Sequence, residues 1–398
     1  MRIYPRLQID IKIHDLFLGL CSYLVPLNRK QLEQDICSFW PSGKHVKVCF
    51  TVRTALDSLL SALNLPEGTE VIMSAVNIKD MADIIESHGL KIVPADIRVE
   101  SMFPASDKIE ALITDKSKIL ILSQLFGSVT GLEPFAKICK KHGMILIEDC
   151  AQAFCGTRYR GSPFADISLF SFGPIKSLTA LGGAVAVANS RDYINKMEKA
   201  EKRYRPKGEF WFLKRILKYL LIKFASFPAL FSLVIKLIIL WDRDPEKTVN
   251  GLSRSFSRGS LLMQIRFKPP VHLLFLLKRR LKKNSDSRFE SRRQNARIFI
   301  NDLKDHVTVP SIGASFHSFW VIPILADNPS GLQKMLLKYG FDSTMADHSQ
   351  KVIKKSGEKG IRLKNAEYVM SRLIYMPDLS EMKKEDKKKL INLIKSNI

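Results

Sequence analysis

Two short stretches of the sequence carry residues that could do chemistry. The first, MILIEDC, ends an apolar run with Glu148 and Asp149 and is followed by Gln152. The second, DISLFSFGPIKSLTALGGAVAVA, contains Ser171 and then Lys176 among apolar residues. A lysine in apolar surroundings has a lowered pKa, so its neutral amine can form a Schiff base. The two stretches therefore offer a carboxylate and a nucleophilic amine within one short segment of chain.

Strand-like apolar runs alternate with helical patterns from about residue 49 to residue 189. Strand-like apolar runs are VIMSAV, KIVPADI, KILILSQL, MILIEDC, DISLFSF and GGAVAVAN, and helical patterns are TALDSLLSALNL, MADIIESHG and LEPFAKICKKHG. Strands that alternate with helices indicate a mainly parallel sheet between helical layers. In such a sheet ligands bind beyond the carboxyl ends of the strands, where Asp149 and Ser171 stand.

An acid at a strand end and a partly buried lysine about one βα unit later fit pyridoxal 5′-phosphate (PLP). The carboxylate would keep the pyridine nitrogen protonated, and the lysine would bond the aldehyde. Taken alone, these residues are weak support for a PLP site. Aspartates are common at strand ends, and most lysines in proteins are surface residues.

The ordered motifs strengthen this interpretation. The run IEDCAQAF followed by FSFGPIKSLTALGGA resembles the signature of the DegT/DnrJ/StrS family of PLP-dependent, fold-type I aminotransferases, in which I-E-D-x-A-Q/H-A precedes F-S-F, K and G-G. The similarity extends to VRTALDSLLSALNLPEGTEVIMSA and HGLKIVPADI upstream, and to GFDSTMADHS and LIYMPDLSEM downstream. It covers most of the chain apart from about 205–290.

The resemblance implies a role for each matching residue. Lys176 would carry the cofactor and move the proton during the reaction. Asp149 would pair with the pyridinium nitrogen, Gln152 would hydrogen-bond the phenolic oxygen, and Ser171 would bind the phosphate. The alternative for Ser171 and Gln152 is ordinary turn and capping chemistry.

The sequence departs from the family pattern at the expected phosphate loop. The family has a Ser-Gly-Thr-type loop before its first helix, where this chain has Thr51, Val52, Arg53 and Thr54. We expect Thr51, Arg53 and Thr54 to bind the phosphate, because the N-terminus of a helix offers free N–H groups and arginine adds a charged donor. The aromatic residue that often covers the ring is replaced near Asn77 or Ile78, so the ring would pack on aliphatic carbon such as that of Val76.

Other candidates remain open at this stage. Arg254, Arg258 or Arg266 could replace the partner-subunit asparagine that often reaches the phosphate, or could be ordinary surface charge. His317 and Trp320 are candidate substrate-side groups, but we expect both to pack in a core, because they lie beside the apolar run SFWVIPIL. His348 could be a substrate-side group or a loop residue.

Composition and charge divide the chain of 398 residues into regions. The formal charge is +24, and residues 201–300 contribute +17 of it, with 24 Lys and Arg against 7 Asp and Glu. We expect an N-terminal arm (1–45), a large αβα PLP-binding domain (46–204), a basic, apolar helical insertion (205–290) and a smaller α+β C-terminal domain (291–398). Six cysteines without CxxC or zinc spacing indicate a reduced, cytoplasmic protein without a bound metal.

The segment from Phe210 to Trp241 is apolar but contains five Lys or Arg residues and Pro228, so we do not expect a transmembrane span. Lys214, Arg215 and Lys218 would share one helical face, and Ile216, Leu217, Leu220 and Leu221 would lie on another. Such a helix suits an anionic membrane surface, where each nearby Lys or Arg contributes about 1 kcal/mol. The competing interpretation is a helix pair buried at a subunit interface. No nucleic-acid-binding signature stands out.

The resemblance implies an aminotransferase that moves an amino group from a donor such as glutamate to a keto-sugar nucleotide in polysaccharide or secondary-metabolite biosynthesis. It also implies a homodimer. The first alternative is a membrane-associated or binding protein on a catalytically degenerate aminotransferase fold. The second is a PLP-dependent sugar dehydratase. In related dehydratases a histidine replaces the lysine, so Lys176 argues against this second alternative.

Overall fold

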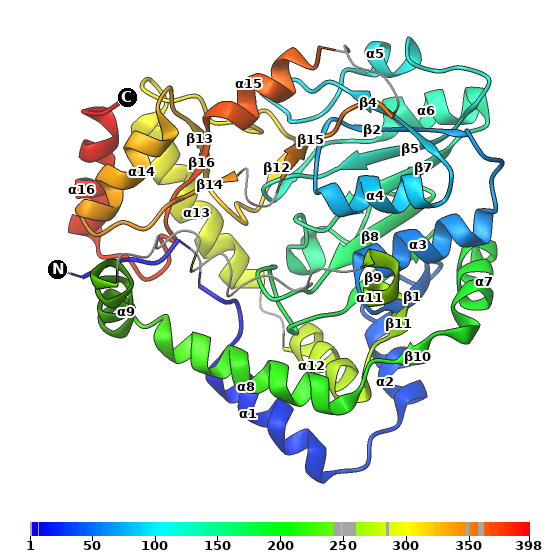
Figure 1. The fold of residues 1–398 in the computed structure, drawn as a ribbon, viewed down its shortest axis with the longest axis horizontal. Helices are drawn as coiled ribbons and strands as arrows, with labels where there is room; N and C mark the ends of the chain where they lie inside the picture. The colour runs from blue at the N-terminus through cyan, green and yellow to red at the C-terminus, as the bar shows by residue number, and fades with distance from the viewer. Residues whose placement is uncertain are drawn as a thin grey trace.

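The computed structural model of the chain describes residues 2–6, 8–241, 248, 260–283, 286–346, 350–356 and 362–398. Figure 1 shows a large lobe built around one sheet and a smaller lobe beside it, where both chain ends lie.

The central sheet has seven strands. Their spatial order is β1 (His45–Cys49), β9 (Ala184–Ala188), β8 (Ile167–Ser171), β7 (Ile145–Cys150), β5 (Ser117–Ser123), β2 (Glu70–Ser74) and β4 (Lys91–Ala95). The strands from β8 to β4 are parallel, whereas β9 runs antiparallel to both β8 and β1. The predicted mainly parallel α/β sheet is confirmed. Strand β1 and the antiparallel edge were outside the sequence prediction.

Helices cover both faces of this sheet. They are α3 (Val52–Leu63), α4 (Lys79–Ser87), α5 (Ser106–Glu110), α6 (Glu133–His142) and α7 (Arg191–Ala200). Because side chains alternate along a strand, Val71 belongs to the same buried cluster as Leu59 of α3 on one face, while Ile72 belongs to that of Phe135 of α6 on the other. The result is a three-layer αβα lobe.

The smaller lobe lies on the C-terminal side of the chain. Its antiparallel sheet has the order β13 (Pro323–Leu325), β16 (Leu373–Tyr375) and β14 (Thr344–Met345), and it packs with α13 (Asp286–Leu303), α14 (Pro329–Lys338), α15 (Lys364–Arg372) and α16 (Lys384–Lys395). The strand expected over SFWVIPILA is shorter than predicted. Phe319 has φ +50°, in the left-handed region, which interrupts an extended run and leaves Trp320 outside the strand.

The N-terminal segment and the connections complete the chain. The helices before the sheet are α1 (Ile13–Cys21), the 3₁₀ turn Ser22–Leu24 and α2 (Arg29–Cys37). Short elements elsewhere are β3 (Val76–Asn77), β6 (Ser128–Val129), the 3₁₀ turns Gly156–Arg158 and Glu201–Arg203, β10 (Arg205–Pro206), β11 (Phe267–Lys268), β12 (Phe316–His317) and β15 (Lys351–Val352).

The basic segment contributes α8 (Glu209–Ala225), α9 (Pro228–Leu240), α11 (Leu261–Ile265) and α12 (Val271–Lys282). Helix α12 is a core element, and its Leu273, Leu276 and Leu277 are fully buried against the large lobe. Figure 1 shows α8 lying along α1 at one side of the molecule.

Helix α8 differs from the predicted division into faces. Ile216 is buried, whereas Leu217 and Leu221 are exposed, so these apolar residues do not share one face. Arg215 turns inward instead of sharing the outer face with Lys214, and its Nε donates to the carbonyl of Leu181 at 2.5 Å. An inward arginine that meets a backbone carbonyl satisfies a buried acceptor, and its stem packs among the apolar residues.

Among the described residues, no single helix is long and apolar enough to cross a bilayer. Helices α8 and α9 reach the necessary length and composition only as a pair joined through a 95° bend.

Candidate active site

The neighbouring parallel strands β7 and β8 end at the same edge of the sheet and bring the first two groups together. Asp149 lies near the end of β7 and pairs in register with Leu169, and Ser171 is the last residue of β8. The turn after β8 then carries Lys176, whose backbone N–H donates to the Gly173 carbonyl at 3.0 Å.

Lys176 lies in surroundings that favour a neutral amine. Burial lowers its pKa to about 8, Asp149 opposes this shift, and the positive charge of Arg53 adds to it. The lysine Nζ lies 4.2 Å from the centre of the Trp320 ring, and the Trp320 Nε1–H donates to the Ile175 carbonyl at 2.9 Å. The half-buried Trp320 therefore contacts Lys176, and the expectation that it packs in a core is wrong.

Asp149 is 7% exposed. Its Oδ1 accepts the Ala151 N–H at 3.0 Å. Burial raises its pKa, while the Ala151 N–H, the charges of Lys176 and Arg53, and the Ser123 hydroxyl act in the opposite direction. A buried carboxyl of this kind gains from a cationic partner, because an adjacent positive charge offsets the cost of desolvation.

The adjacent acid, Glu148, lies on the opposite face of β7 and serves the fold. It is fully buried and accepts hydrogen bonds from Gln124 Nε2 (2.9 Å), Ser162 N (3.0 Å), Ser168 Oγ (2.7 Å) and the Tyr159 hydroxyl. These four donors satisfy the carboxylate without a metal or ligand. Only Asp149 of the acidic pair therefore belongs to the candidate active site.

The side-chain oxygens of Gln152 and Ser171 each accept a backbone N–H, which leaves the Gln152 NH2 and the Ser171 hydroxyl hydrogen able to donate to a ligand. The Gln152 Oε1 accepts the Phe126 N–H at 2.8 Å, and its amide NH2 has no acceptor within the described ranges. The Ser171 Oγ accepts the Gly173 N–H at 3.4 Å. A side-chain oxygen fixed by a backbone N–H orients the whole amide, so Gln152 can present its NH2 group to a ligand oxygen.

The predicted phosphate loop begins helix α3. The Thr51 Oγ1 accepts the Thr54 N–H at 3.0 Å, which caps the helix. The Thr54 hydroxyl donates to the Ile265 carbonyl at 2.7 Å, so both hydroxyls already make structural bonds. The Arg53 Nε donates to Asp80 at 2.6 Å. The backbone at the start of α3 and the Arg53 guanidinium are therefore the groups here best suited to an anion.

The remaining sequence candidates have different outcomes. Arg266 binds Asp57 through two hydrogen bonds, at 3.0 and 2.9 Å, and is therefore already paired within its own chain. Asn77 is buried, and its Nδ2 donates to Ser123 Oγ at 3.0 Å. His317 is buried as predicted, between Ser311 Oγ and the Phe319 N–H, and burial lowers its pKa to about 3. Arg254, Arg258 and His348 lie outside the described residues.

Part of the chain matches a known protein family. Residues 27–209 match the sequence model of the DegT/DnrJ/EryC1/StrS aminotransferase family, which confirms the resemblance over this part of the chain. The chain is 33% identical over 171 residues to the pleiotropic regulatory protein of Geobacillus stearothermophilus, covering 42% of this chain and 45% of that protein. It is 31% identical over 156 residues to the GDP-perosamine synthase of Vibrio cholerae, covering 38% and 42%. The chain thus spans less than half the length of the curated relatives that it matches.

Solved structures resemble the whole fold. Helicobacter pylori PseC, an aminotransferase involved in the biosynthesis of pseudoaminic acid, superposes with a TM-score of 0.73 at 19% identity and covers 99% of each chain. The Escherichia coli GDP-4-keto-6-deoxy-D-mannose-3-dehydratase with bound hydrated PLP gives a TM-score of 0.69 at 16% identity, covering 99% of this chain and 100% of that chain. The chain therefore shares the fold of these proteins, and the predicted fold-type I architecture is confirmed.

Proposed function

We propose that the protein is a PLP-dependent aminotransferase. The observation that carries this proposal is the placement of Lys176 and Asp149 at one edge of the sheet, where burial shifts the pKa of each group toward its neutral form and the charge of the other group opposes that shift. Groups with perturbed pKa values gather at functional sites. The family match over residues 27–209 covers both residues and supports the assignment.

The residues at this edge fit PLP. Asp149 would meet the ring nitrogen, and Gln152 would donate its free amide NH2 to the phenolic oxygen. Ser171, the start of α3 at Thr51 and the Arg53 side chain would hold the phosphate. When bound, PLP supplies an electron sink that stabilises negative charge on the substrate carbon.

The chain itself supplies proton transfer and orientation. With its pKa at about 8, the Lys176 amine can both accept and return a proton near neutral pH, which is the requirement for a general acid and base. The buried Asp149 carboxylate would stabilise a positive charge on a bound group, because a nearby cation offsets the cost of burying the carboxylate. The Trp320 ring covers one side of Lys176 and limits access of water to the amine.

We assign the substrates by chemical class, as a keto-sugar nucleotide and an amino donor such as glutamate. The sugar-nucleotide enzymes among the relatives and the excess positive charge support an anionic acceptor. Two of the solved structures that resemble the chain are of a sugar dehydratase. Lys176 favours the transferase, because a lysine can return a proton to the substrate carbon that received the amino group.

The assay is formation of 2-oxoglutarate from glutamate in the presence of PLP and a panel of nucleotide-linked 4-keto sugars. Turnover that depends on both partners supports the proposal. Loss of the sugar hydroxyl without formation of an amino sugar would assign the protein to the dehydratases instead.

We also propose that the enzyme is a cytoplasmic homodimer, as is typical of this fold. Sedimentation equilibrium of the full chain should give twice the chain mass of 45.3 kDa. A monomer that retains full turnover would contradict the dimer.

Arg53 gives a prediction about the phosphate. Arg53→Ala should raise the apparent Kd for PLP by about tenfold or more, because a charge-assisted hydrogen bond contributes about 1.5–3 kcal/mol. Equilibrium dialysis of PLP measures this change. Asp80→Asn is the matched control, because it removes the carboxylate that Arg53 contacts at 2.6 Å but keeps the guanidinium. Equal PLP affinity in Arg53→Ala and the parent, with both proteins folded, would exclude the role.

A second function, attachment to a membrane surface, is favoured by the outer side of α8 and α9. Ten large apolar side chains there are each at least 40% exposed: Phe210, Leu217, Leu221, Phe224, Phe227, Leu230, Leu233, Leu237, Leu240 and Trp241. They make up half of the exposed large apolar residues identified in the described chain. We call this set the α8–α9 apolar surface. Exposed apolar patches of this kind mark interaction sites.

The charge of the segment selects an anionic bilayer as the occupant. Lys214, Lys218 and Lys236 are exposed beside the apolar side chains, and Glu209 is the one acid between residues 209 and 241. A two-fold contact between copies would bring these like charges together. A bilayer with anionic headgroups accepts both the apolar residues and the lysines.

Flotation with phosphatidylglycerol vesicles tests the attachment. We expect the full chain to bind these vesicles in low salt, to bind phosphatidylcholine vesicles poorly, and to lose most binding in Leu221→Glu. The control is Ile298→Glu on α13, an exposed apolar residue distant in sequence from this surface. Absence of vesicle binding, together with dissociation of an oligomer in Leu221→Glu, would assign the α8–α9 apolar surface to a second copy of the chain.

A further inference from the structure

The turn that carries Lys176 is held from outside the central sheet. We call residues 172–182 the lysine loop. Four positions that flank Lys176 each bond a different part of the chain: the Ile175 carbonyl to Trp320 Nε1 (2.9 Å), the Ser177 Oγ to Arg292 Nη2 (3.1 Å), the Leu178 N–H to Asp10 Oδ2 (3.1 Å) and the Thr179 carbonyl to Arg280 Nε (3.2 Å). The loop thus contacts the smaller lobe, α13, the N-terminal arm and α12.

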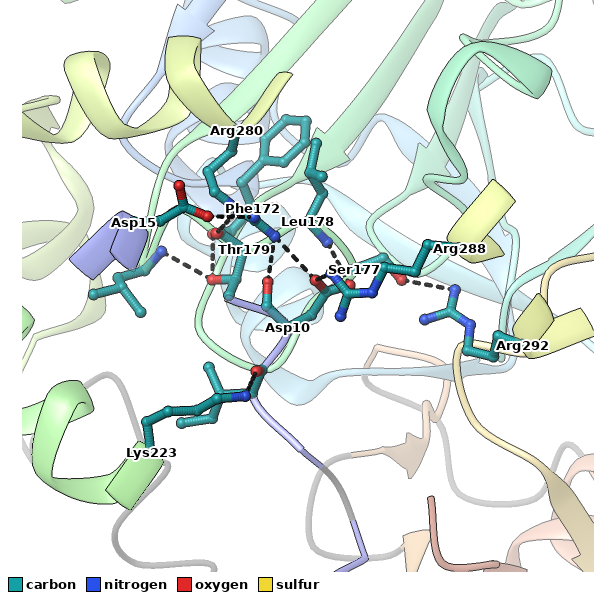
Figure 2. Close-up of polar contacts among 12 residues, drawn as sticks. Asp10, Asp15, Phe172, Ser177, Leu178, Thr179, Lys223, Arg280, Arg288 and Arg292 are labelled. Atoms are coloured by element: carbon teal, nitrogen blue, oxygen red, sulfur yellow. Dashed lines mark hydrogen bonds and ion pairs between the residues drawn. The ribbon is translucent and has the colours of Figure 1, made fainter. Parts of the chain in front are cut away.

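Asp10 and Arg280 form the centre of this arrangement (Figure 2). Arg280 is 5% exposed. Its Nη2 donates to the Asp10 carbonyl at 2.6 Å and to Asp10 Oδ1 at 3.0 Å, and its Nη1 donates to Asp15 Oδ2 at 2.9 Å. Arg288 pairs with Asp10 at 2.5 Å, and Arg279 pairs with Asp15 at 2.8 Å. Two carboxylates and three guanidiniums therefore pair with one another, and Arg280 and Asp15, at the centre, are buried.

The arm that carries Asp10 is itself fixed. The Lys223 Nζ of α8 donates to the Ile9 carbonyl at 2.9 Å, which Figure 2 shows beside the ion pairs. Burial lowers the pKa of Lys223, and the nearby Asp10 charge acts against that shift. The basic segment therefore anchors the N-terminal arm against the lysine loop through both α8 and α12.

The loop needs such support because its backbone is strained. Leu178 has φ +54° and Leu181 has φ +63°, both in the left-handed region that leucine rarely adopts. Conformations of this kind persist only where the surroundings hold them. Asp10 accepts a hydrogen bond from the N–H of the strained Leu178. The carbonyl of the strained Leu181 accepts one from Arg215 Nε at 2.5 Å.

We propose that Asp10 is a positioning residue for Lys176. By accepting the Leu178 N–H while paired with Arg280, it holds the lysine loop in its strained conformation and keeps the amine near Asp149. Asp10 acts through Leu178 and not by contact with the amine. The inference rests on the proposed role of Lys176 as the residue that carries the cofactor.

The test reads the position of Lys176 in the cofactor-free protein. The full chain without PLP is treated briefly with acetic anhydride at a series of pH values, and peptide mass spectrometry measures labelling of Lys176. The midpoint of this curve reports the pKa of the Lys176 amine, which burial lowers. Asp149 and Arg53, the charges that act on Lys176, are unchanged in every variant below.

We expect the parent midpoint near pH 8 and a rise of at least about one pH unit in Asp10→Ala, because a relaxed loop returns the amine toward the ordinary lysine value. Asp10→Asn should stay near the parent, because its amide oxygen can still accept the Leu178 N–H. Asp15→Asn is the matched control. It removes a carboxylate from the same Arg280, and within the described part of the chain the Asp15 carboxylate accepts hydrogen bonds from Arg279 and Arg280 but none from the lysine loop.

A purely structural role would give a different pattern. Asp10→Ala and Asp15→Asn would then lower the melting temperature alike and leave the Lys176 midpoint at the parent value, and that result would overturn the proposal. Asp10→Ser, which keeps a polar but shorter side chain, provides the same comparison if Asp10→Ala does not fold. Uptake of PLP by the parent protein is measured separately. A parent that takes up no PLP would refute the proposed function, while the labelling comparison would still decide whether Asp10 positions Lys176.

Discussion

Lys176→Ala is expected to abolish amino-group transfer, with a fall in kcat of at least about a thousandfold. A positioned acid–base group contributes about 10²–10⁴-fold, and this variant also loses the nucleophile. The fold should persist, because the backbone bond from the Lys176 N–H to the Gly173 carbonyl does not require the side chain. Turnover of the amino donor, followed as 2-oxoglutarate, measures the loss.

The matched control for this prediction is Lys79→Ala. Lys79 is exposed on α4 and pairs with Asp83 on the same helix at 2.6 Å. An exposed pair of this kind contributes little to stability, so the control should retain parent activity. Residual turnover above about a tenth of the parent in Lys176→Ala would show that a different group performs the proton transfer.

Asp149→Asn carries the second large effect. We expect a fall in kcat of about 10²–10³-fold, corresponding to about 3–4 kcal/mol, because a neutral amide cannot hold a positive charge on a ring nitrogen at this buried position. The asparagine oxygen can still accept the Ala151 N–H, so the melting temperature should change little. Steady-state kinetics and thermal unfolding measured on the same preparation separate the two effects.

Substitution of the neighbouring Glu148 should lower stability and leave kcat unchanged, the opposite of the result expected for Asp149→Asn. Glu148→Gln introduces an NH2 group where the carboxylate accepts four donors, so at least one buried donor loses its partner. This should cost about 1–3 kcal/mol of stability and leave the kcat of folded protein near that of the parent. If both variants lost activity and stability in parallel, Asp149 would be a structural acid like Glu148.

The local pattern of the sequence predicted most of the large lobe and the central pair of the site. Alternating apolar runs and helical periods located the parallel strands, and the position of strand ends brought Asp149 and Ser171 to one edge. These features depend on residues close together in the chain. Strand β1 was missed because HVKVC is short and only half-buried, and its pairing partner β9 lies far along the chain.

The residues that surround Lys176 could not be predicted in the same way. Asp10 and Arg280 are 270 residues apart, and nothing in either local sequence indicates that they meet. Trp320 lies in an apolar run typical of a strand, but the left-handed Phe319 turns the chain there and places the indole on Lys176. The spacing of the basic residues predicted that Arg215 would lie on the outer face of its helix with Lys214. In the structure Arg215 points inward and donates to the Leu181 carbonyl. Each depends on contacts between distant segments.

The assignment of Lys176 as the cofactor lysine is tested by the visible absorption spectrum of the full chain with added PLP, recorded before and after borohydride. Peptide mass mapping then locates the reduced adduct. We expect a bound-PLP absorption band that borohydride removes, with one reduced adduct located on Lys176. Absence of the band, or adducts spread over exposed lysines such as Lys79 and Lys214, would contradict the assignment of Lys176 as the cofactor lysine.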